Sequence, residues 1–149
     1  MAIGEVCNRE VVIAETGMAV PEAARLMRQY HVGTLVVVED VEGRRRPLGM
    51  VTDRDIAIEV VAAGVDPDSL TVGDIMATDL ASVREDVGVF DTIRYMRSRG
   101  VRRVPVVDNG GWLIGIVTLD DLFELLAEEL SEMADMISRG RQREAATRT

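Results

Sequence analysis

The sequence predicts an α/β protein built from two copies of one strand-helix-strand-strand-helix unit. A seven-residue pattern of Gly, an apolar residue, Val, Thr, two variable residues and Asp occurs at Gly49–Asp55 and again at Gly115–Asp121. An apolar run precedes each copy, Val32–Val38 in the first half and Val101–Val107 in the second. Two matching segments in the same order indicate an internal duplication.

Composition is typical of a folded protein. The 149 residues are 47% hydrophobic but only 3% aromatic, so Val, Ile, Leu, Met and Ala must form the core. One repeat of this size would be marginally stable alone, so we expect the two repeats to pack together. The net charge of −9, with Arg as the only basic residue type besides one His, argues against broad nonspecific binding to nucleic acid or an anionic membrane.

Cys7 is the only cysteine, which excludes an intramolecular disulfide and a zinc site made of cysteines. We expect its thiol to be buried among apolar groups rather than reactive. The sequence shows neither a signal peptide nor an apolar run of about 18 residues. We therefore expect a soluble protein of a reducing compartment, the cytoplasm.

The elements of the first repeat follow from its apolar patterning. Pro21 suits the first position of an amphipathic helix, and Gly64 suits a helix stop. Glu42–Pro47 is longer than the matching connection of the second repeat, and we expect it to form a hairpin loop. The expected elements are a strand at Val11–Ala14, a helix at Pro21–Tyr30, strands at Leu35–Val38 and Leu48–Val51, and a helix from Thr52 to Gly64.

The second repeat starts near Val72 and follows the same order. Asp86 is a candidate cap for a helix that Gly100 would close. The side chains expected on the buried face of that helix are Val89, Phe90, Ile93 and Met96. The expected hairpin strands are Val104–Val107 and Leu113–Val117. As domain boundaries we predict repeat 1 at 1–63, a linker at 64–74, repeat 2 at 75–130, and a helix extension with a tail at 131–149.

The last predicted helix is longer than its counterpart. Its apolar stripe continues to Ile137, beyond the expected end of the repeat, and its other face is acidic. This pattern fits a solvated face behind a core or dimer stripe, or a helix that docks on a specific partner. The polar segment Arg139–Thr149 is expected to fray.

The repeated motif has a purely structural interpretation. Thr52 and Thr118 each precede an apolar helical pattern and are followed three residues later by Asp55 and Asp121, which is a capping box. That interpretation explains the Thr and the Asp but not the Gly-apolar-Val before them. A helix start at a strand end also suits an anion, and a carboxylate can accept hydrogen bonds from two ribose hydroxyls.

The chain resembles the paired CBS domain, or Bateman module, named after cystathionine beta-synthase. The two Gly-x-Val-Thr-x-x-Asp motifs, the repeat order and the segment Val101-Arg102-Arg103-Val104-Pro105-Val106-Val107 carry this resemblance, which covers about Gly4 to Leu130. The segment Val51–Ile56 followed by Ala62–Pro67 is similar to small stand-alone bacterial members. The resemblance implies two repeats related by a pseudo-twofold axis.

The resemblance also implies binding of an adenosine-containing ligand, AMP, ADP, ATP, NAD or S-adenosylmethionine, in clefts between the repeats. Asp121 and Thr118 would hold ribose or phosphate in one cleft, and Asp55 and Thr52 in the other. Basic residues of the middle strand contact phosphate in some family members. Arg102 and Arg103 match those positions and would favour phosphate at the Asp121 site, or they are solvated residues at a strand end. Arg54 is a further candidate, which would face phosphate at the Asp55 site.

The leading hypothesis is a regulatory sensor that forms a homodimer and acts in trans on an unknown protein partner. The alternative is a ligand-independent dimerisation or scaffold module in which both motifs are only caps. An enzyme is not expected, because Ser, Cys and His show no nucleophile-base arrangement. We expect no metal site, since Asp120 and Asp121 diverge on a helix without further ligands. His31, at a helix end, is assigned a local role.

Overall fold

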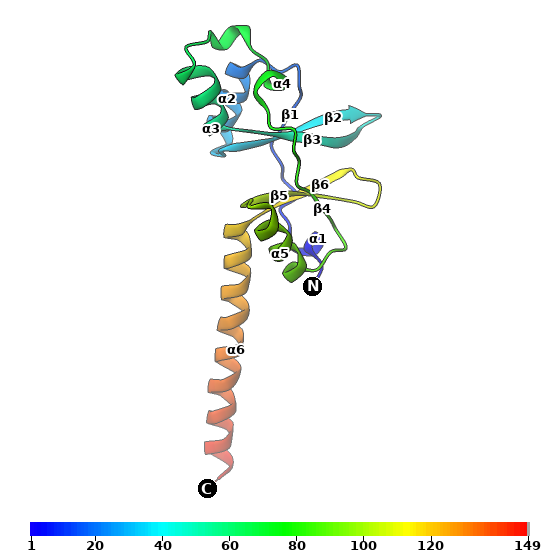
Figure 1. The fold of residues 1–149 in the computed structure, drawn as a ribbon. Helices are drawn as coiled ribbons and strands as arrows, with labels where there is room; N and C mark the ends of the chain where they lie inside the picture. Colours follow the sequence, from blue (N-terminus) through cyan, green and yellow to red (C-terminus); the bar gives the residue numbers. More distant parts are fainter. Residues whose placement is uncertain (149) are drawn as a thin grey trace. The chain divides into compact units, whose positions relative to one another are not determined.

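The computed structural model describes residues 1–148 and divides the chain into two compact units. The first unit, Met1–Val117, contains both sheets and the helices other than the last. The second begins at Thr118 and contains the long helix α6, Leu119–Thr147 (Figure 1).

The first sheet has the order β1-β2-β3. Strand β1 pairs in parallel with β2, and β2 pairs antiparallel with β3, with Thr34 opposite Thr52. A parallel pair needs a crossover, which α2 provides. The elements are β1 Ile13–Ala14, α2 Val20–Tyr30, β2 Thr34–Val41, β3 Arg44–Thr52, α3 Asp53–Ile56 and a π-helix at Ala57–Ala62.

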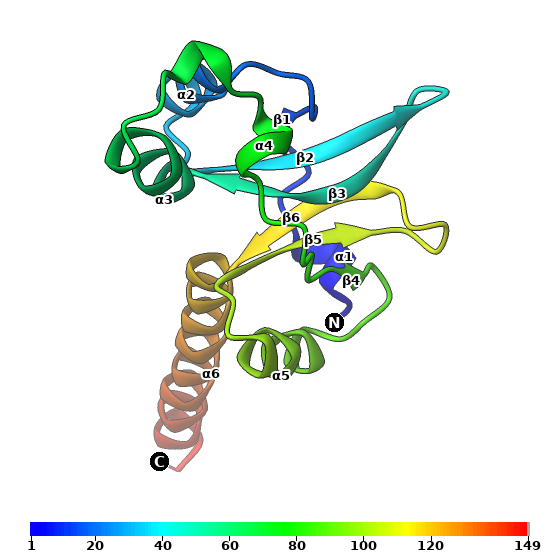
Figure 2. The same ribbon diagram turned by 45° about the horizontal axis from the view of Figure 1, so that its top comes forward.

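The second sheet has the same topology, with the order β4-β5-β6 and a parallel β4-β5 pair. Its elements are β4 Val83–Arg84, α5 Val89–Arg99, β5 Arg103–Val107 and β6 Leu113–Thr118. In both views the β2-β3 and β5-β6 hairpins lie against each other (Figures 1 and 2). The duplication inferred from the motifs and the mixed α/β class are confirmed.

Each repeat donates a short helix to the other. Helix α1, Ile3–Val6, lies on the second repeat, where the Ile3 amide donates to the Val87 carbonyl (2.7 Å). Helix α4, Val72–Ile75, lies on the first repeat, where the Val72 amide donates to the Met18 carbonyl (2.8 Å). Ile3 and Val72 are both fully buried. The repeats therefore share their cores, as their small individual size requires.

The glycine of each repeated motif lies where an exchanged segment crosses a strand. Met50 bridges to Ala77 beside Gly49, and Ile116 bridges to Asn8 beside Gly115. A β-carbon on Gly49 would overlap the Ala77 carbonyl oxygen, and one on Gly115 would lie 2.6 Å from the Cys7 sulfur. Glycine is thus required by close backbone approach. This explains the part of the motif that capping leaves unexplained.

The expected hairpin loop at Glu42–Pro47 is wrong for most of its length. Strand β3 already begins at Arg44, and the chain reverses at Glu42 and Gly43, which have positive φ values of 54° and 83°. Arg44, Arg45 and Arg46 therefore extend the antiparallel pairing between β2 and β3. Arg44 and Arg46 stack on Trp112 of the other hairpin, with guanidinium carbons 5.7 and 4.9 Å from the ring centroid, a cation-π contact between the repeats.

Two expectations for α5 are corrected. Gly88, not Asp86, is the N-cap residue, and Asp86 instead accepts a hydrogen bond from Arg84 (3.1 Å). Phe90 is 66% exposed, because the buried face of the helix turns toward Val89, Thr92 and Met96. Thr92 is tolerated there because its hydroxyl donates to the Gly88 carbonyl (2.9 Å). Gly100 closes the helix in the left-handed conformation, as expected.

Two further segments differ in detail from expectation. The helix after Thr52 changes from α to π geometry at Ala57 before Gly64 ends it with a φ of 69°. The C-terminal segment is helical to Thr147 rather than frayed, since it consists largely of good helix formers. Thr149, which the fraying prediction included, lies outside the described residues. The segment 64–74, predicted as a linker, contains a 3₁₀ turn at Pro67–Ser69 and the start of α4.

Substitution of Gly49 by Ala should destabilise the protein, because the added methyl group meets the Ala77 backbone rather than a flexible side chain. Overpacking of this kind costs roughly 1–3 kcal/mol. Urea unfolding followed by circular dichroism would measure it. Gly17→Ala is the control, since a β-carbon added at Gly17 would meet nothing within 4 Å and its φ is not positive. Equal stability of the two variants would contradict this account of the crossing.

Candidate functional site

The first motif forms a complete capping box at the start of α3. The Thr52 hydroxyl accepts a hydrogen bond from the Asp55 amide (3.0 Å), and Asp55 Oδ2 accepts one from the Thr52 amide (2.9 Å). Both residues are partly exposed. Within residues 1–148 the other carboxylate oxygen, Oδ1, accepts no hydrogen bond. It is free for a ligand while Oδ2 keeps the helix start in place.

The second motif has the same geometry in its own unit. Thr118 caps α6, accepting from the Asp121 amide (3.1 Å), and Asp121 Oδ2 accepts from the Thr118 amide (3.2 Å). Among the described residues its Oδ1 is again without a donor, and Asp121 is exposed. The structural interpretation of both motifs as caps is therefore correct. Within each capping box, only one of the two carboxylate oxygens accepts a hydrogen bond.

Of the arginines proposed from the sequence, Arg103 is the one held in place. It is partly buried, and its guanidinium donates to the hydroxyl of Thr34 in the first repeat. Thr34 and Arg103 occupy matching positions of the two repeats, so their contact lies near the axis that relates the repeats. Thr34 also pairs with Thr52, which brings Arg103 close to the first motif. Arg102 and Arg54 are exposed.

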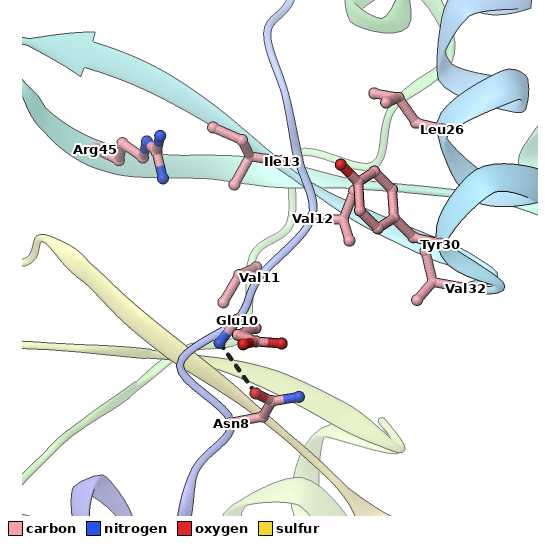
Figure 3. A pocket seen from close by; sticks show the side chains of 9 residues that line it. All are labelled: Asn8, Glu10, Val11, Val12, Ile13, Leu26, Tyr30, Val32 and Arg45. Carbon is pink, nitrogen blue, oxygen red and sulfur yellow. Dashed lines mark hydrogen bonds between the residues drawn. The ribbon is translucent and has the colours of Figure 1, made fainter.

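A pocket of about 530 Å³ lies beside the N-terminal segment (Figure 3). Between its bridge to Ile116 and its pairing with β2, this segment passes from one sheet to the other. The pocket is formed by this connecting segment and the first repeat, and none of its lining residues lies within residues 72–128. It is lined by Asn8, Glu10, Val11, Val12, Ile13, Leu26, Tyr30, Val32 and Arg45.

The lining of the pocket combines an apolar wall with polar groups. The Tyr30 ring lies beside Val12, with Val32 below it, while the Arg45 guanidinium stands apart on β3 (Figure 3). The Glu10 amide donates to Asn8 Oδ1 (3.0 Å), which fixes the turn at the lower rim. A flat apolar group and an anion can both be accommodated there, and the volume is in the usual range for small-molecule sites.

The pocket lining includes none of the seven residues proposed from the motifs. Its residues come from three separate segments: residues 8–13, the stretch from Leu26 of α2 to Val32 just after it, and Arg45 of β3. The one sequence signal for this pocket is the Arg44–Arg46 run, for which the sequence predicts a loop. Because neighbouring side chains of a strand point to opposite faces, the exposed Arg45 lines the pocket while Arg44 and Arg46 stack on Trp112.

Two other kinds of site are not found in the described part of the chain. Within residues 1–148, no three His, Cys, Asp or Glu side chains come close enough together to hold a metal ion. In the same range, none of the helices combines the length and the apolar character needed to cross a membrane.

The family model for the CBS domain matches the chain twice, at residues 3–62 and 72–128. The chain belongs to the CBS domain family. Its two CBS repeats include the exchanged helices α1 and α4 at their starts. The recognition of a tandem CBS protein from the motifs is confirmed.

Relatives and solved structures are similar to this chain over most of its length. Protein MK0525 of Methanopyrus kandleri is 36% identical over 84% of the chain, which spans 62% of that protein. The crystal structure of Hypoxic Response Protein I, solved with two coordinated zinc ions, is 31% identical with a TM-score of 0.71 and covers 83% of this chain and 98% of that one. The CBS pair of protein MJ0100, in complex with 5-methylthioadenosine and S-adenosyl-L-methionine, is 25% identical with a TM-score of 0.71, covering 85% and 99%.

Cys7, next to the pocket residue Asn8, should react slowly with thiol reagents. Partial burial raises the pKa of its thiol, and the nearby Arg9 offsets only part of this effect. Its sulfur also contacts the Gly4 carbonyl (3.6 Å). At pH 8 we expect its reaction with a disulfide reagent to be slower in the folded protein than in urea, because less thiolate is present. A reaction equally fast in both states would show that the thiol is not shielded.

Proposed function

We propose that this protein is a regulatory sensor that binds an adenosine-containing nucleotide between its two CBS repeats. The observation that carries the proposal is the unused oxygen of Asp55 and of Asp121. A capping carboxylate with one free oxygen at a helix start can accept a ribose hydroxyl without giving up its structural bond.

The lining of the pocket beside the N-terminal segment suits an adenosine group. Val12, Val32 and the Tyr30 ring offer an apolar wall for a flat base. The adenosine compounds bound by the CBS pair of MJ0100 support the same ligand class. Ligands that carry phosphate, AMP, ADP, ATP or NAD, are favoured over S-adenosylmethionine, which has none, because Arg45 and Arg103 stand at two places along the proposed cleft.

Phosphate recognition is assigned to Arg45 and Arg103. Arg45 reaches the pocket from β3, and Arg103 lies near the axis between the repeats with its guanidinium tied to Thr34. A guanidinium held by one hydrogen bond keeps further donors for phosphate oxygens. Arg54 and Arg102, both exposed, would act at the outer ends of a longer phosphate chain.

The signal would arise from the packing of the repeats. The N-terminal segment lines the pocket, pairs with β2 and bridges to β6, so a ligand that moves it affects both sheets. A ligand that binds one packing arrangement more tightly shifts the population toward it. We propose that the resulting change in repeat or dimer packing alters affinity for a protein partner in the cytoplasm, without catalysis.

Calorimetric titration of AMP, ADP, ATP, NAD and S-adenosylmethionine tests the proposal. Hydrogen bonds to a charged group contribute about 1.5–3 kcal/mol, so Asp121→Ala should weaken the ligand that binds by about tenfold to a hundredfold. Asp120→Ala is the matched control, because it removes the same charge from the same helical turn outside the capping box. Asp121→Asn keeps a capping acceptor and should still lose affinity.

The alternative, a ligand-independent scaffold, is favoured by the completeness of both capping boxes without any ligand. It predicts no saturable binding to wild-type protein freed of copurified nucleotide. It also predicts that Asp121→Ala changes only stability. Prolonged incubation with ATP, assayed for products, separates a sensor from an enzyme.

Arg103→Ala should selectively weaken phosphorylated ligands. We expect ATP affinity to fall at least about tenfold, with a change of less than about threefold for adenosine, because only the phosphates meet the guanidinium. Thr34→Val is the control, since it removes the Thr34 partner but leaves the cation. An equal loss for adenosine and ATP would show that Arg103 supports the fold rather than the ligand.

A further inference from the structure

The long helix α6 presents an apolar stripe to solvent. Leu130, Met133 and Ile137 are 66%, 59% and 59% exposed, and Phe123 is exposed as well. The match to the CBS family model ends at residue 128, so most of this stripe lies outside the repeats. Single exposed apolar residues are ordinary, but a continuous stripe on one helix face indicates an interaction surface.

The stripe has the spacing of a coiled-coil seam. Its members alternate by three and four residues, which is the a and d pattern of a heptad. In order they are Phe123, Leu126, Leu130, Met133, Ile137 and, at the next position, Gly140. A helix of 29 residues is about 43 Å long, enough to carry several such layers.

Charge along α6 is divided between its two halves. Every charged residue from Asp120 to Asp135 is acidic, and every charged residue beyond it except Glu144 is Arg. Two copies of α6 side by side in parallel would place acid against acid and Arg against Arg. In an antiparallel pair centred between Leu130 and Met133, the Arg segment 139–143 of each helix lies opposite Asp120–Glu124 of the other, while the acidic residues 128–135 of the two copies lie near one another at the centre. Only the antiparallel orientation brings opposite charges together, at both ends of the pair, and this favours it.

Gly140 supports the same orientation. A glycine inside a helix costs about 1 kcal/mol relative to alanine, and a β-carbon added at Gly140 would meet nothing within 4 Å. In an antiparallel pair in which Leu130 of each copy meets Met133 of the other, Phe123 lies opposite Gly140. The largest side chain of the seam then meets the residue without one.

We propose that α6 is a self-association surface, on which the α6 helix of a second copy of this chain packs antiparallel through the stripe from Phe123 to Gly140. The surface needs no nucleotide, so it is independent of the function proposed above. Two chains joined in this way would present two pairs of CBS repeats to one partner.

Disulfide trapping tests both the surface and its orientation. In a Cys7→Ala background, Phe123→Cys and Gly140→Cys are prepared as separate proteins, one with a tag that changes its size. After subunit exchange and mild oxidation, the mixture should give the mixed dimer, and each protein alone should remain uncrosslinked. In the antiparallel pair equal positions are about 25 Å apart along the axis, too far for a disulfide.

Met133→Glu, introduced into both proteins, should reduce the yield of mixed dimer at least about tenfold, because it places a charge in the seam. Ser131→Glu, which adds the same charge off the stripe, should leave the yield within about twofold. Circular dichroism checks that both variants stay helical. The proposal would be overturned if each protein crosslinked with itself, if the mixture gave no crosslink, or if the two glutamate substitutions had equal effects. Nucleotide titration of the Met133→Glu protein tests the proposed sensor function separately, because Met133 is not one of the residues proposed to bind the nucleotide.

Discussion

The structure depends on two close crossings of the backbone. Where Ala77 passes Gly49 and Asn8 passes Gly115, a segment of one repeat forms a bridge with a strand of the other. Each crossing continues into a short helix whose buried residue, Val72 or Ile3, completes the opposite core. Neither repeat can therefore complete its core without the other, and a displacement of either segment is felt in both sheets.

This arrangement places the candidate pocket on the element that joins the repeats. The segment that bridges to Ile116 and pairs with β2 also supplies much of the pocket wall. A ligand there would contact a shared element rather than one repeat alone. The contact of Arg103 with Thr34 and the stacking of Arg44 and Arg46 on Trp112 tie the same two hairpins together. Polar contacts can rearrange without opening an apolar core, which suits a module that signals through packing.

In the proposed function, each capping box gives one residue a structural and a binding role. One oxygen of Asp55 or Asp121 completes the first turn of a helix, and the other faces no donor within the described chain. Caps are local in sequence, and the helix start provides partial positive charge and free amide groups for an anion. The proposed site would therefore be preorganised by the same bonds that begin the helix.

The sequence by itself determined the duplication, the order of elements and the capping boxes, because these depend on residues a few positions apart. Thr52 reaches Asp55 within one turn, and alternation or helical spacing is read along one segment. Only the tertiary structure decided the exchange of α1 and α4, the reason for Gly49 and Gly115, and the pocket. Arg45, Tyr30 and Val12 come from three separate segments, and Phe90 was misplaced because the buried face of α5 is set by the sheet beneath it. Which distant backbones meet is a property of packing, which local patterns do not encode.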